Sequence, residues 1–435
     1  MRPHPNPSSQ LVALALAGFA LGVAGAAQAE NLRIATWNLG WHVASSEVQA
    51  WAAQCGKHYV KNPATQVWAL ASPDAPGAKR GWDITESRAT LEGVDLSVMP
   101  PCNVYQTAQH QGIAVTPNAH ARRNQQLSQI LARDVRADVI AFQEVSGTQA
   151  VIEALGPAAS DFNVCSFDGQ YKVQRLAFAW RKTLGGPVEA CRDLPAVSLP
   201  ALPAQDRVRP AYTVVLNLAG KRVRFLTVHL KSGCVTPLDK RPKRLDDPSA
   251  EPCVVLQQQV QPLEESLEAL GQGVDHFVVL GDFNRNLAHE QRQVKGAEAV
   301  RSDGTSDLTR PMPAGVSTRN LFLEVNDGHP TGSKAVLLLP KCPGSPALEA
   351  ACDASKTGVP TPEQQALLSG KSGLGCRNPV GLDHIIVSQG LASAEVHTRK
   401  VSIGALGGSR PASAQHADPL LAVSDHCPLV TELRF

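Results

Sequence analysis

The stretch FVVLGDFNRN, residues 277–286, decides how this chain folds. It begins with an unbroken apolar run of aromatic and β-branched residues, which is typical of a buried strand. Asp282 follows that run directly, and Asn284 comes two residues later. A strand holds its end rigidly, and the loop beyond it exposes polar side chains. The stretch therefore predicts a strand that presents a carboxylate and an amide at one edge of a sheet.

Five other segments place polar groups beside an apolar run in the same way. They carry Asn38 after Leu32–Trp37, Glu144 after Asp138–Gln143, His229 with Lys231 and Ser232 after Val223–Val228, Asp383 before Ile385–Val387, and Asp425 with His426 before Cys427–Pro428. Chance does not plausibly supply six such segments in one chain. We expect these side chains to meet at one site.

Helical and strand patterns alternate along the chain. The residues predict a helix over Arg122–Asp134 that leads into a strand from Asp138, and a helix over Val255–Leu270 that leads into a strand from His276. The stretches 212–218 and 223–229 alternate around an Ala-Gly pair, which predicts a hairpin. This order of elements favours an α/β domain with mixed sheets.

Composition argues against a disordered chain and against a strongly basic one. The 435 residues are 43% hydrophobic and 18% charged, which is typical of a globular chain with an ample core. The formal net charge is only +2, so any attraction to phosphate must be local.

The N-terminus predicts export. Residues 1–29 resemble a secretory signal peptide, with Arg2, an apolar stretch over 11–24 and the cleavage sequence Ala-Gln-Ala at 27–29. A membrane anchor is the alternative, but the stretch is shorter than the roughly 20 residues of a spanning helix. We expect no stable membrane insertion. The choice between periplasm and medium, and the oligomeric state, stay open.

The ten cysteines fit an oxidising compartment, because none belongs to a CxxC pair and disulfides are the default after export. Their order predicts Cys55–Cys102, Cys165–Cys191 and Cys234–Cys253 and leaves the other four open. Seven lie in three Pro-, Gly-, Ser- and Ala-rich stretches near 42–120, 233–253 and 294–376. We interpret these stretches as insertions in a single domain over 30–435.

The residue types at the predicted site suit hydrolysis of a phosphodiester, which needs a divalent cation, an activated water and help for the leaving oxygen. Mg²⁺ takes oxygen ligands and keeps several waters, so one or two carboxylates suffice, with Mn²⁺ or Ca²⁺ as alternatives. The sequence offers Glu144, Asp282 and Asp425 as carboxylates, Asn38 and Asn284 as amides, and His229 and His426 as acid–base groups, with Asp383 placed to orient His426.

The segments TWNLGW, AFQEV, HLKSG, GDFNRN, GLDHI and SDHCP resemble the ordered motifs of the endonuclease/exonuclease/phosphatase superfamily. Deoxyribonuclease I, exonuclease III, neutral sphingomyelinases and inositol polyphosphate 5-phosphatases belong to it. The resemblance touches both ends of the mature chain and its middle. It implies an α/β (α+β) four-layer sandwich, in which two packed mixed β-sheets are flanked by helices, here with disulfide-stapled insertions.

The resemblance also implies a role for each site residue. Glu144 would be the principal metal ligand, with Asn38 beside it and Asp425 near the metal. Asp282 would align or deprotonate the attacking water, and Asn284 would hold the phosphate. His426, supported by Asp383, would contact the scissile phosphate, and His229 would contact phosphate or act as general acid.

One departure concerns the partner of His229. Nucleases of the deoxyribonuclease I type place a glutamate in the segment that resembles Tyr171–Arg181, and Gln174 stands there in this chain. A glutamine can orient His229 but stabilises its charged form less, which argues against the general-acid role.

The substrate is less clearly marked. Lys240, Arg241, Lys243 and Arg244 form a basic cluster on the insertion after His229, where they would grip a sugar–phosphate backbone or remain a solvated loop. Lys231 and Ser232 would contact phosphate or only cap their strand. HLKSG is closer to the HFKS-type segment of bacterial extracellular nucleases than to phosphatase or sphingomyelinase patterns.

We therefore expect a secreted, Mg²⁺-dependent phosphodiesterase, with nucleic acid as its partner and DNA as the favoured substrate, cut with little sequence preference. A sphingomyelinase-type phospholipase C or a phosphomonoesterase is the alternative on the same scaffold, and the apolar stretch Ala335–Leu339 would then serve as membrane-docking element. A binding or toxin subunit with a vestigial site is a further alternative, against which the complete residue set argues.

Overall fold

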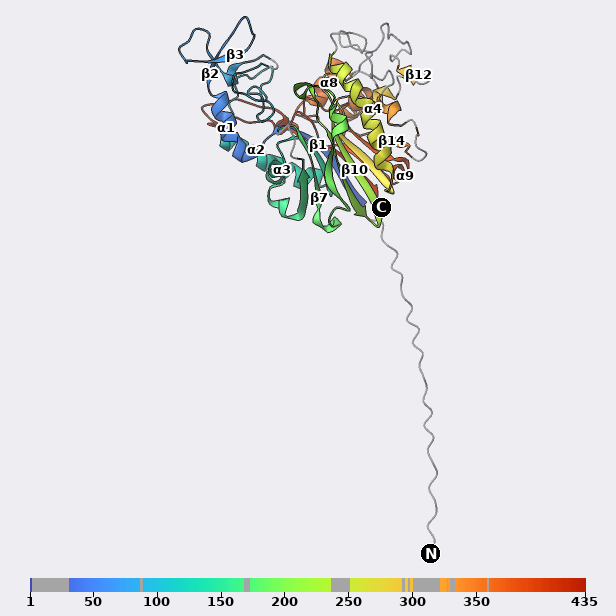
Figure 1. Cartoon of the computed structure of the whole chain (residues 1–435). Helices are drawn as coiled ribbons and strands as arrows, with labels where there is room; N and C mark the ends of the chain where they lie inside the picture. The colour runs from blue at the N-terminus through green and yellow to red at the C-terminus, as the bar shows by residue number, and fades with distance from the viewer. Residues whose placement is uncertain are drawn as a thin grey trace.

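The computed structural model describes residue 1 and residues 31–86, 89–167, 173–235, 251–291, 294–295, 298–299, 321–326, 328, 333–357 and 360–435. Beyond residue 1, the expected signal peptide lies outside these ranges, and so does the basic cluster Lys240–Arg244. Figure 1 shows the course of the whole chain.

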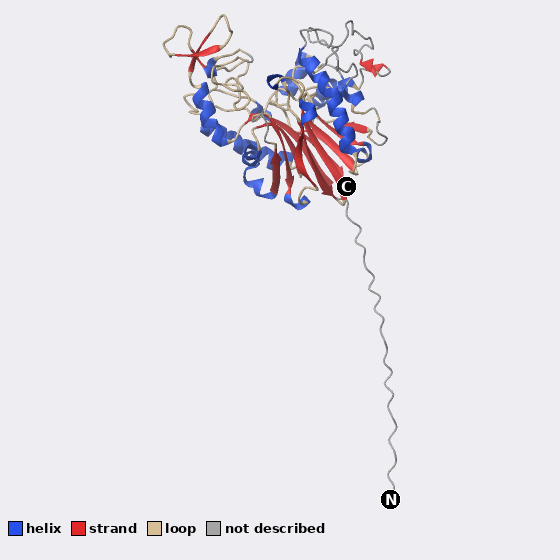
Figure 2. Ribbon diagram, in the orientation of Figure 1, coloured by secondary structure: helices blue, strands red, loops and turns tan. Residues whose placement is uncertain are grey.

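Two six-stranded mixed sheets lie face to face at the centre of the molecule (Figure 2). The first sheet has the order β16 (Glu395–Lys400), β17 (Leu429–Arg434), β1 (Asn31–His42), β5 (Val139–Val145), β7 (Arg175–Arg181) and β6 (Phe162–Ser166). The second has the order β14 (Ala335–Leu338), β15 (Asp383–Ser388), β11 (His276–Asp282), β10 (Lys221–His229), β9 (Ala211–Leu218) and β8 (Glu189–Leu194).

The core between the sheets comes from alternate residues on their inner faces. Ile34, Val139 and Phe178 of the first sheet belong to the same buried cluster as Phe225 and Val278 of the second, and none of the five is measurably exposed. Side chains alternate across a strand, so the other residues of the same strands face outward and bury against helices.

Helices cover the outer face of each sheet (Figure 2). The helices are α1 (Ser45–Cys55), α2 (Pro117–Ile130), α3 (Thr148–Leu155), α4 (Glu251–Gly271), α5 (Leu287–Glu290), α6 (Leu321–Glu324), α7 (Pro346–Thr357), α8 (Pro362–Ser369) and α9 (Gln389–Ala392). Helices α2 and α3 pack on the first sheet, and α4 packs on the second. The layers run helix, sheet, sheet, helix, which confirms the expected four-layer sandwich.

The insertion near 42–120 contains structure of its own. It begins with α1 and continues with a small sheet of β2 (His58–Lys61), β3 (Trp68–Ala71) and β4 (Lys79–Arg80), which stands to one side of the sandwich (Figure 1). Trp51, Trp82 and Tyr105 form the centre of a separate buried cluster in this lobe. The third insertion holds the short pair β12 (Val294–Lys295) and β13 (Glu298–Ala299).

Five disulfides staple the described residues. Cys55–Cys102, Cys165–Cys191 and Cys234–Cys253 confirm the three pairs that the sequence order predicts. The four cysteines that the sequence left open form Cys342–Cys352 and Cys376–Cys427. Among the described helices, none combines the length and apolar character that crossing a bilayer requires.

Candidate active site

The central strands bring their polar ends to one edge of the sandwich. Strands β1 and β5 run parallel, and so do β10 and β11, so their carboxyl ends lie at the same edge of each sheet. In the second sheet His229 stands opposite Asp282, and Asp282 stands opposite Asp383, which begins the antiparallel strand β15. The expectation that separate segments converge is met here through strand register.

Asn38 joins the two sheets at the centre of the site. Its Nδ2 donates to Asp282 Oδ2 at 3.0 Å and to Glu144 Oε1 at 3.3 Å. Its Oδ1 accepts from the backbone N–H of Gly40 at 2.9 Å, which fixes the orientation of the amide. His229 Nε2 lies 3.5 Å from Glu144 Oε1 and 3.6 Å from Asp282 Oδ2. Two carboxylates therefore face one another across an amide and an imidazole.

Three residues of the site hold left-handed backbone conformations that side chains rarely adopt. Trp41, Glu144 and Asn284 have φ of 54°, 56° and 50°. Each such residue costs of order 1–3 kcal/mol and persists only where its surroundings enforce it. The Trp41 N–H donates to Glu144 Oε2 at 2.9 Å, and the Asn284 N–H donates to Asp282 Oδ1 at 2.8 Å. The strained backbone thus aims donors at the two carboxylates.

His426 is held from both sides. Its Nδ1 lies 3.0 Å from Asp383 Oδ1, and Lys400 Nζ lies 2.9 Å from Asp383 Oδ2. The backbone N–H of His426 donates to Ser424 Oγ at 2.9 Å, and that hydroxyl donates to the Asn38 carbonyl at 2.6 Å. These contacts place the Nε2 of the ring 3.7 Å from Asp282 Oδ2.

Charge in this corner is unevenly compensated. Burial would lower the pKa of His426, but the carboxylates of Asp383, Asp282 and Asp425 outweigh it and raise the pKa to about 10. Burial would raise the pKa of Asp383, but the cations of Lys400 and His426 hold it well below its usual range. His426 is thus an imidazolium and Asp383 a carboxylate at neutral pH.

Glu144 and Asp282 are compensated less completely, because nearby cations do not cancel the effect of burial. Burial, and then the charge of Asp425, raise the pKa of Glu144 to about 7. Burial raises the pKa of Asp282 to about 6, with Asp383 adding to it and His426 opposing it. Buried carboxylates that face one another with raised pKa values are a donor set that a divalent cation would stabilise. The residues present therefore fit a metal ion.

A second grouping of possible ligands shares Asp282. One ligand atom each of Asp282, Asp383 and His426 lie within 4.8 Å of one another. Lys400 and His426 already neutralise Asp383, so a cation there would compete with two protein cations. Glu144 and Asp282, whose pKa values stay raised despite nearby cations, are the better ligand pair on electrostatic grounds.

The surroundings of His229 differ from the expectation. Arg209 Nη1 donates to Gln174 Oε1 at 2.6 Å, and Arg209 Nε donates to the His229 carbonyl at 3.0 Å. Gln174 is therefore linked to the backbone of His229 through Arg209. Within the described part of the chain, the ring atom Nδ1 of His229 is buried without a hydrogen-bond partner. Burial, with Arg209 and His426, keeps the pKa of His229 well below 6.5. A neutral ring suits contact with phosphate better than proton donation.

The other expected residues line the loops after the strands. Asn284 Nδ2 donates to the Leu230 carbonyl at 3.0 Å, which ties the loop after β11 to the loop after β10. Lys231 is half-buried, and its backbone N–H donates to Gln259 Oε1 at 2.8 Å, while Ser232 is exposed. His384 turns away from the site, with Nε2 2.9 Å from the Arg285 carbonyl.

Sequence reasoning missed four polar residues near the site, namely Lys400, Arg209, Arg377 and Asn378. Arg377 Nη2 lies 2.6 Å from Asp425 Oδ2, and Asn378 Nδ2 lies 3.1 Å from the same oxygen. Lys400 is the last residue of β16, and several other site residues also lie at strand ends. That position is the only sequence signal for Lys400. The segment of Arg377 and Asn378 carries no apolar run.

Two packed sheets with buried carboxylates, amides and imidazoles at their strand ends define a hydrolase that acts on phosphoester bonds. The model of the Endonuclease/Exonuclease/phosphatase family matches residues 103–426, and the chain belongs to this family. Members of the family are typically dependent on a divalent metal. No curated protein matches the sequence significantly.

The chain is similar to several solved structures at low sequence identity. Humanized TDP2 of D. rerio is 10% identical, with a TM-score of 0.40 over 93% of this chain and 99% of that chain. A family protein of Bacteroides thetaiotaomicron is 14% identical, with a TM-score of 0.41 over 94% of this chain and 99% of that chain. The mannosyl-6-phosphatase Bt3783 of the same organism is 14% identical, with a TM-score of 0.39 over 73% and 92%.

Proposed function

We propose that the protein is an exported, Mg²⁺-dependent phosphodiesterase, an endonuclease that hydrolyses DNA with little sequence specificity. The observation that carries the proposal is the pair of Glu144, largely buried, and Asp282, fully buried, joined through Asn38 and adjacent to the His426–Asp383 pair. A phosphodiester carries negative charge, and this corner offers a protein cation and a donor set for a metal cation beside one another.

Each residue has a task in such a reaction. Glu144 and Asp282, with Asn38 between them, would hold the metal ion, which when bound neutralises the phosphate and assists attack by water. Asp282 has its pKa raised to about 6, so at pH 7 it is ionised and basic enough to orient a water molecule.

The imidazolium of His426 donates from Nε2 to a phosphate oxygen, while Asp383 and Lys400 keep the ring charged and in place. His229, with its pKa well below 6.5, contacts phosphate as a neutral donor or acceptor. Asn284 fixes the loop that carries Asp282 through its own backbone N–H.

The phospholipase alternative has weaker support. The stretch Ala335–Leu339 was interpreted as a possible membrane-docking element, and this interpretation is wrong. Residues 335–338 form the edge strand β14, which pairs with β15, and Ala335, Leu337 and Leu338 are buried in the core. In this stretch only the side chain of Leu339, which follows the strand, is exposed, at 43%.

Export is supported by the five disulfides, because disulfides of this number persist in oxidising compartments. Cleavage after residue 29 would leave Glu30 as the first residue, and N-terminal sequencing of the protein recovered from a secreting host tests this. An intact N-terminus in that fraction would contradict the signal peptide.

The test of activity uses purified, oxidised protein with Mg²⁺ on supercoiled plasmid, sphingomyelin vesicles and p-nitrophenyl phosphate in parallel. Asp282→Ala and His426→Ala should each lower hydrolysis by about 10²–10⁴-fold. Asp275→Ala is the matched carboxylate control, because Asp275 directly precedes the first residue of β11 and Asp282 is the last. His397→Ala, exposed on β16, is the matched histidine control.

Plasmid nicking that disappears in EDTA and in both site variants, but not in the controls, supports the nuclease. Lipid cleavage with intact plasmid, or cleavage of p-nitrophenyl phosphate alone, would move the substrate to the phospholipase or phosphomonoesterase class. Absence of hydrolysis on all three substrates would contradict the proposed function and favour a binding or toxin subunit with a vestigial site.

A further inference from the structure

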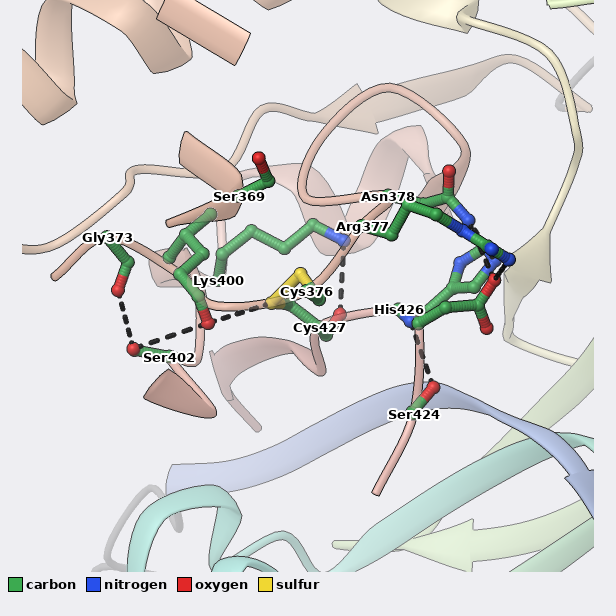
Figure 3. The surroundings of a disulfide bond; sticks show 12 residues. Ser369, Gly373, Cys376, Arg377, Asn378, Lys400, Ser402, Ser424, His426 and Cys427 are labelled. Atoms are coloured by element: carbon green, nitrogen blue, oxygen red, sulfur yellow. Dashed lines mark hydrogen bonds and ion pairs between the residues drawn. A yellow bond between two sulfur atoms is a disulfide. The ribbon is translucent and has the colours of Figure 1, made fainter. Parts of the chain in front are cut away.

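The segment Cys376-Arg377-Asn378 lies against the segment Asp425-His426-Cys427 (Figure 3). The Cys376–Cys427 disulfide joins them at one end. The Asn378 N–H donates to the Asp425 carbonyl at 2.7 Å, and Asn378 and His426 form a parallel β-bridge. Pro379 follows Asn378, and a residue before proline is restricted to extended backbone. Covalent, hydrogen-bond and local constraints all fix Asn378 beside His426.

The side chain of Asn378 is turned toward the same region as the His426 ring (Figure 3). Its Nδ2 lies 3.1 Å from Asp425 Oδ2 and 3.3 Å from His426 Nε2. An amide nitrogen carries two N–H groups, so one is used by Asp425 and the other lies beside Nε2 of His426. Asp383 occupies the opposite ring nitrogen of His426 and accepts its proton there.

We propose that Asn378 is a further substrate-binding residue, whose amide donates to the same phosphate oxygen that His426 contacts. The proposal rests on phosphoester hydrolysis at this site and is independent of whether DNA is the substrate. Two donor nitrogens 3.3 Å apart can both reach one oxygen at ordinary hydrogen-bond distance. A phosphate oxygen that binds here would therefore accept from an amide and an imidazole together.

This geometry gives Asp425 and Arg377 a positioning role. Asp425 accepts from the Asn378 amide, so it determines that Nδ2, and not the amide oxygen, faces His426. Arg377, whose side chain is 71% exposed, neutralises Asp425 from the solvent side at 2.6 Å. Asp425 thus acts as the acceptor that orients a phosphate donor, in place of the metal contact that the resemblance implies.

The test compares Asn378→Ala and Asn378→Asp with wild type on bis(p-nitrophenyl) phosphate with Mg²⁺, with inorganic phosphate as competing ligand. We expect kcat/KM to fall about 10- to 100-fold in both variants, because a donor to the phosphate is lost. The phosphate inhibition constant should rise by a similar factor, and Asn378→Asp should be at least as impaired because it adds a negative charge.

Gln365→Ala is the matched control, because this half-buried amide donates to the Arg377 carbonyl at 3.3 Å without facing His426. It should stay within about twofold of wild type in both measurements. Thermal unfolding midpoints should be unchanged in all three variants. An Asn378→Ala protein with wild-type kcat/KM and wild-type phosphate inhibition would overturn the proposal, and so would a loss shared equally by Gln365→Ala.

The disulfide offers an independent measurement. Cys376→Ser with Cys427→Ser should reproduce the Asn378→Ala defect, while Cys165→Ser with Cys191→Ser, which removes a disulfide between β6 and β8, should not. Phosphate binding measured by a thermal shift separates this proposal from the proposed function. A wild-type protein that hydrolyses nothing but is stabilised by phosphate through Asn378 rejects the function alone. A protein that neither hydrolyses nor binds phosphate rejects both.

Discussion

Lys400 Nζ lies 2.9 Å from Oδ2 of Asp383, and the side chains are 0% and 1% exposed. Asp383 is the carboxylate that faces Nδ1 of His426, so the lysine is linked to the His426 imidazole through one shared partner. Burying a carboxylate alone is costly, and this lysine provides the compensating charge from a strand of the other sheet. The ion pair therefore couples the two sheets and keeps Asp383 ionised.

Replacing Lys400 by methionine should be strongly destabilising. The variant keeps the apolar stem but leaves Asp383 buried with only His426 as cation, so we expect the free energy of unfolding to fall by about 3–5 kcal/mol. Lys61→Met removes a lysine from a solvent-screened pair with Glu86 and should cost far less. Urea unfolding measures both, and equal losses in the two variants would contradict the buried role.

Gly281 permits the close pairing of β10 and β11 just before His229 and Asp282. It has φ of +143°, and a Cβ at this position would lie 2.1 Å from the Val228 carbonyl oxygen. Gly281→Ala should therefore separate the strands, lower stability by about 2–4 kcal/mol and abolish activity. Gly186→Ala should be nearly neutral, because no atom of the described chain lies within 4 Å of its Cβ. Retained activity and stability in Gly281→Ala, measured together, would refute this account.

Much of the site could be predicted because its residues lie beside strongly apolar strands. Asn38, Glu144, His229 and Asp282 lie at or near the carboxyl ends of parallel strands, and a local pattern is enough to find such positions. The hairpin was predicted over 212–218 and 223–229, and the structure has β9 at Ala211–Leu218 and β10 at Lys221–His229. Three disulfides followed from cysteine order because each joins two successive cysteines and closes one insertion or excursion of the chain.

The rest depends on contacts between distant segments. Lys400 reaches Asp383 because β16 pairs with β17 in the first sheet. Asn378 is held beside His426 by a backbone hydrogen bond to Asp425 and by a disulfide that the sequence left open. Gln174 is bound by Arg209, which contacts the backbone carbonyl of His229 and not its ring. Such positions follow from register and cross-linking, which local periodicity does not determine.

His120 should make stability depend on pH. It stacks on His42 with ring centroids 5.7 Å apart. Burial, with the charge of Arg123, lowers its pKa from 6.5 to about 4. Between these values the unfolded chain binds the proton and the folded protein does not, so stability is lost as pH falls from 6.5 toward 4.

Between pH 7 and pH 5 the free energy of unfolding should fall by about 2 kcal/mol less in His120→Phe than in wild type. The variant still loses the part that comes from His42, whose pKa is lowered as well. His416→Gln, at an exposed turn, serves as control and should leave the pH dependence unchanged. Urea unfolding at the two pH values decides the question, and a parallel loss in wild type and His120→Phe would contradict it.

Glu144 should oppose folding when no metal is bound. Its pKa is raised from 4.5 to about 7, so the folded protein holds the proton more tightly than the unfolded chain. Stability therefore falls as pH rises from about 4.5 through 7, and the carboxylate is fully unfavourable above that range. In EDTA at pH 8, Glu144→Gln should raise the free energy of unfolding by about 1–3 kcal/mol. Mg²⁺ should stabilise wild type and the exposed control Glu265→Gln, but not Glu144→Gln, and a Mg²⁺ shift of equal size in all three would exclude Glu144 as a ligand.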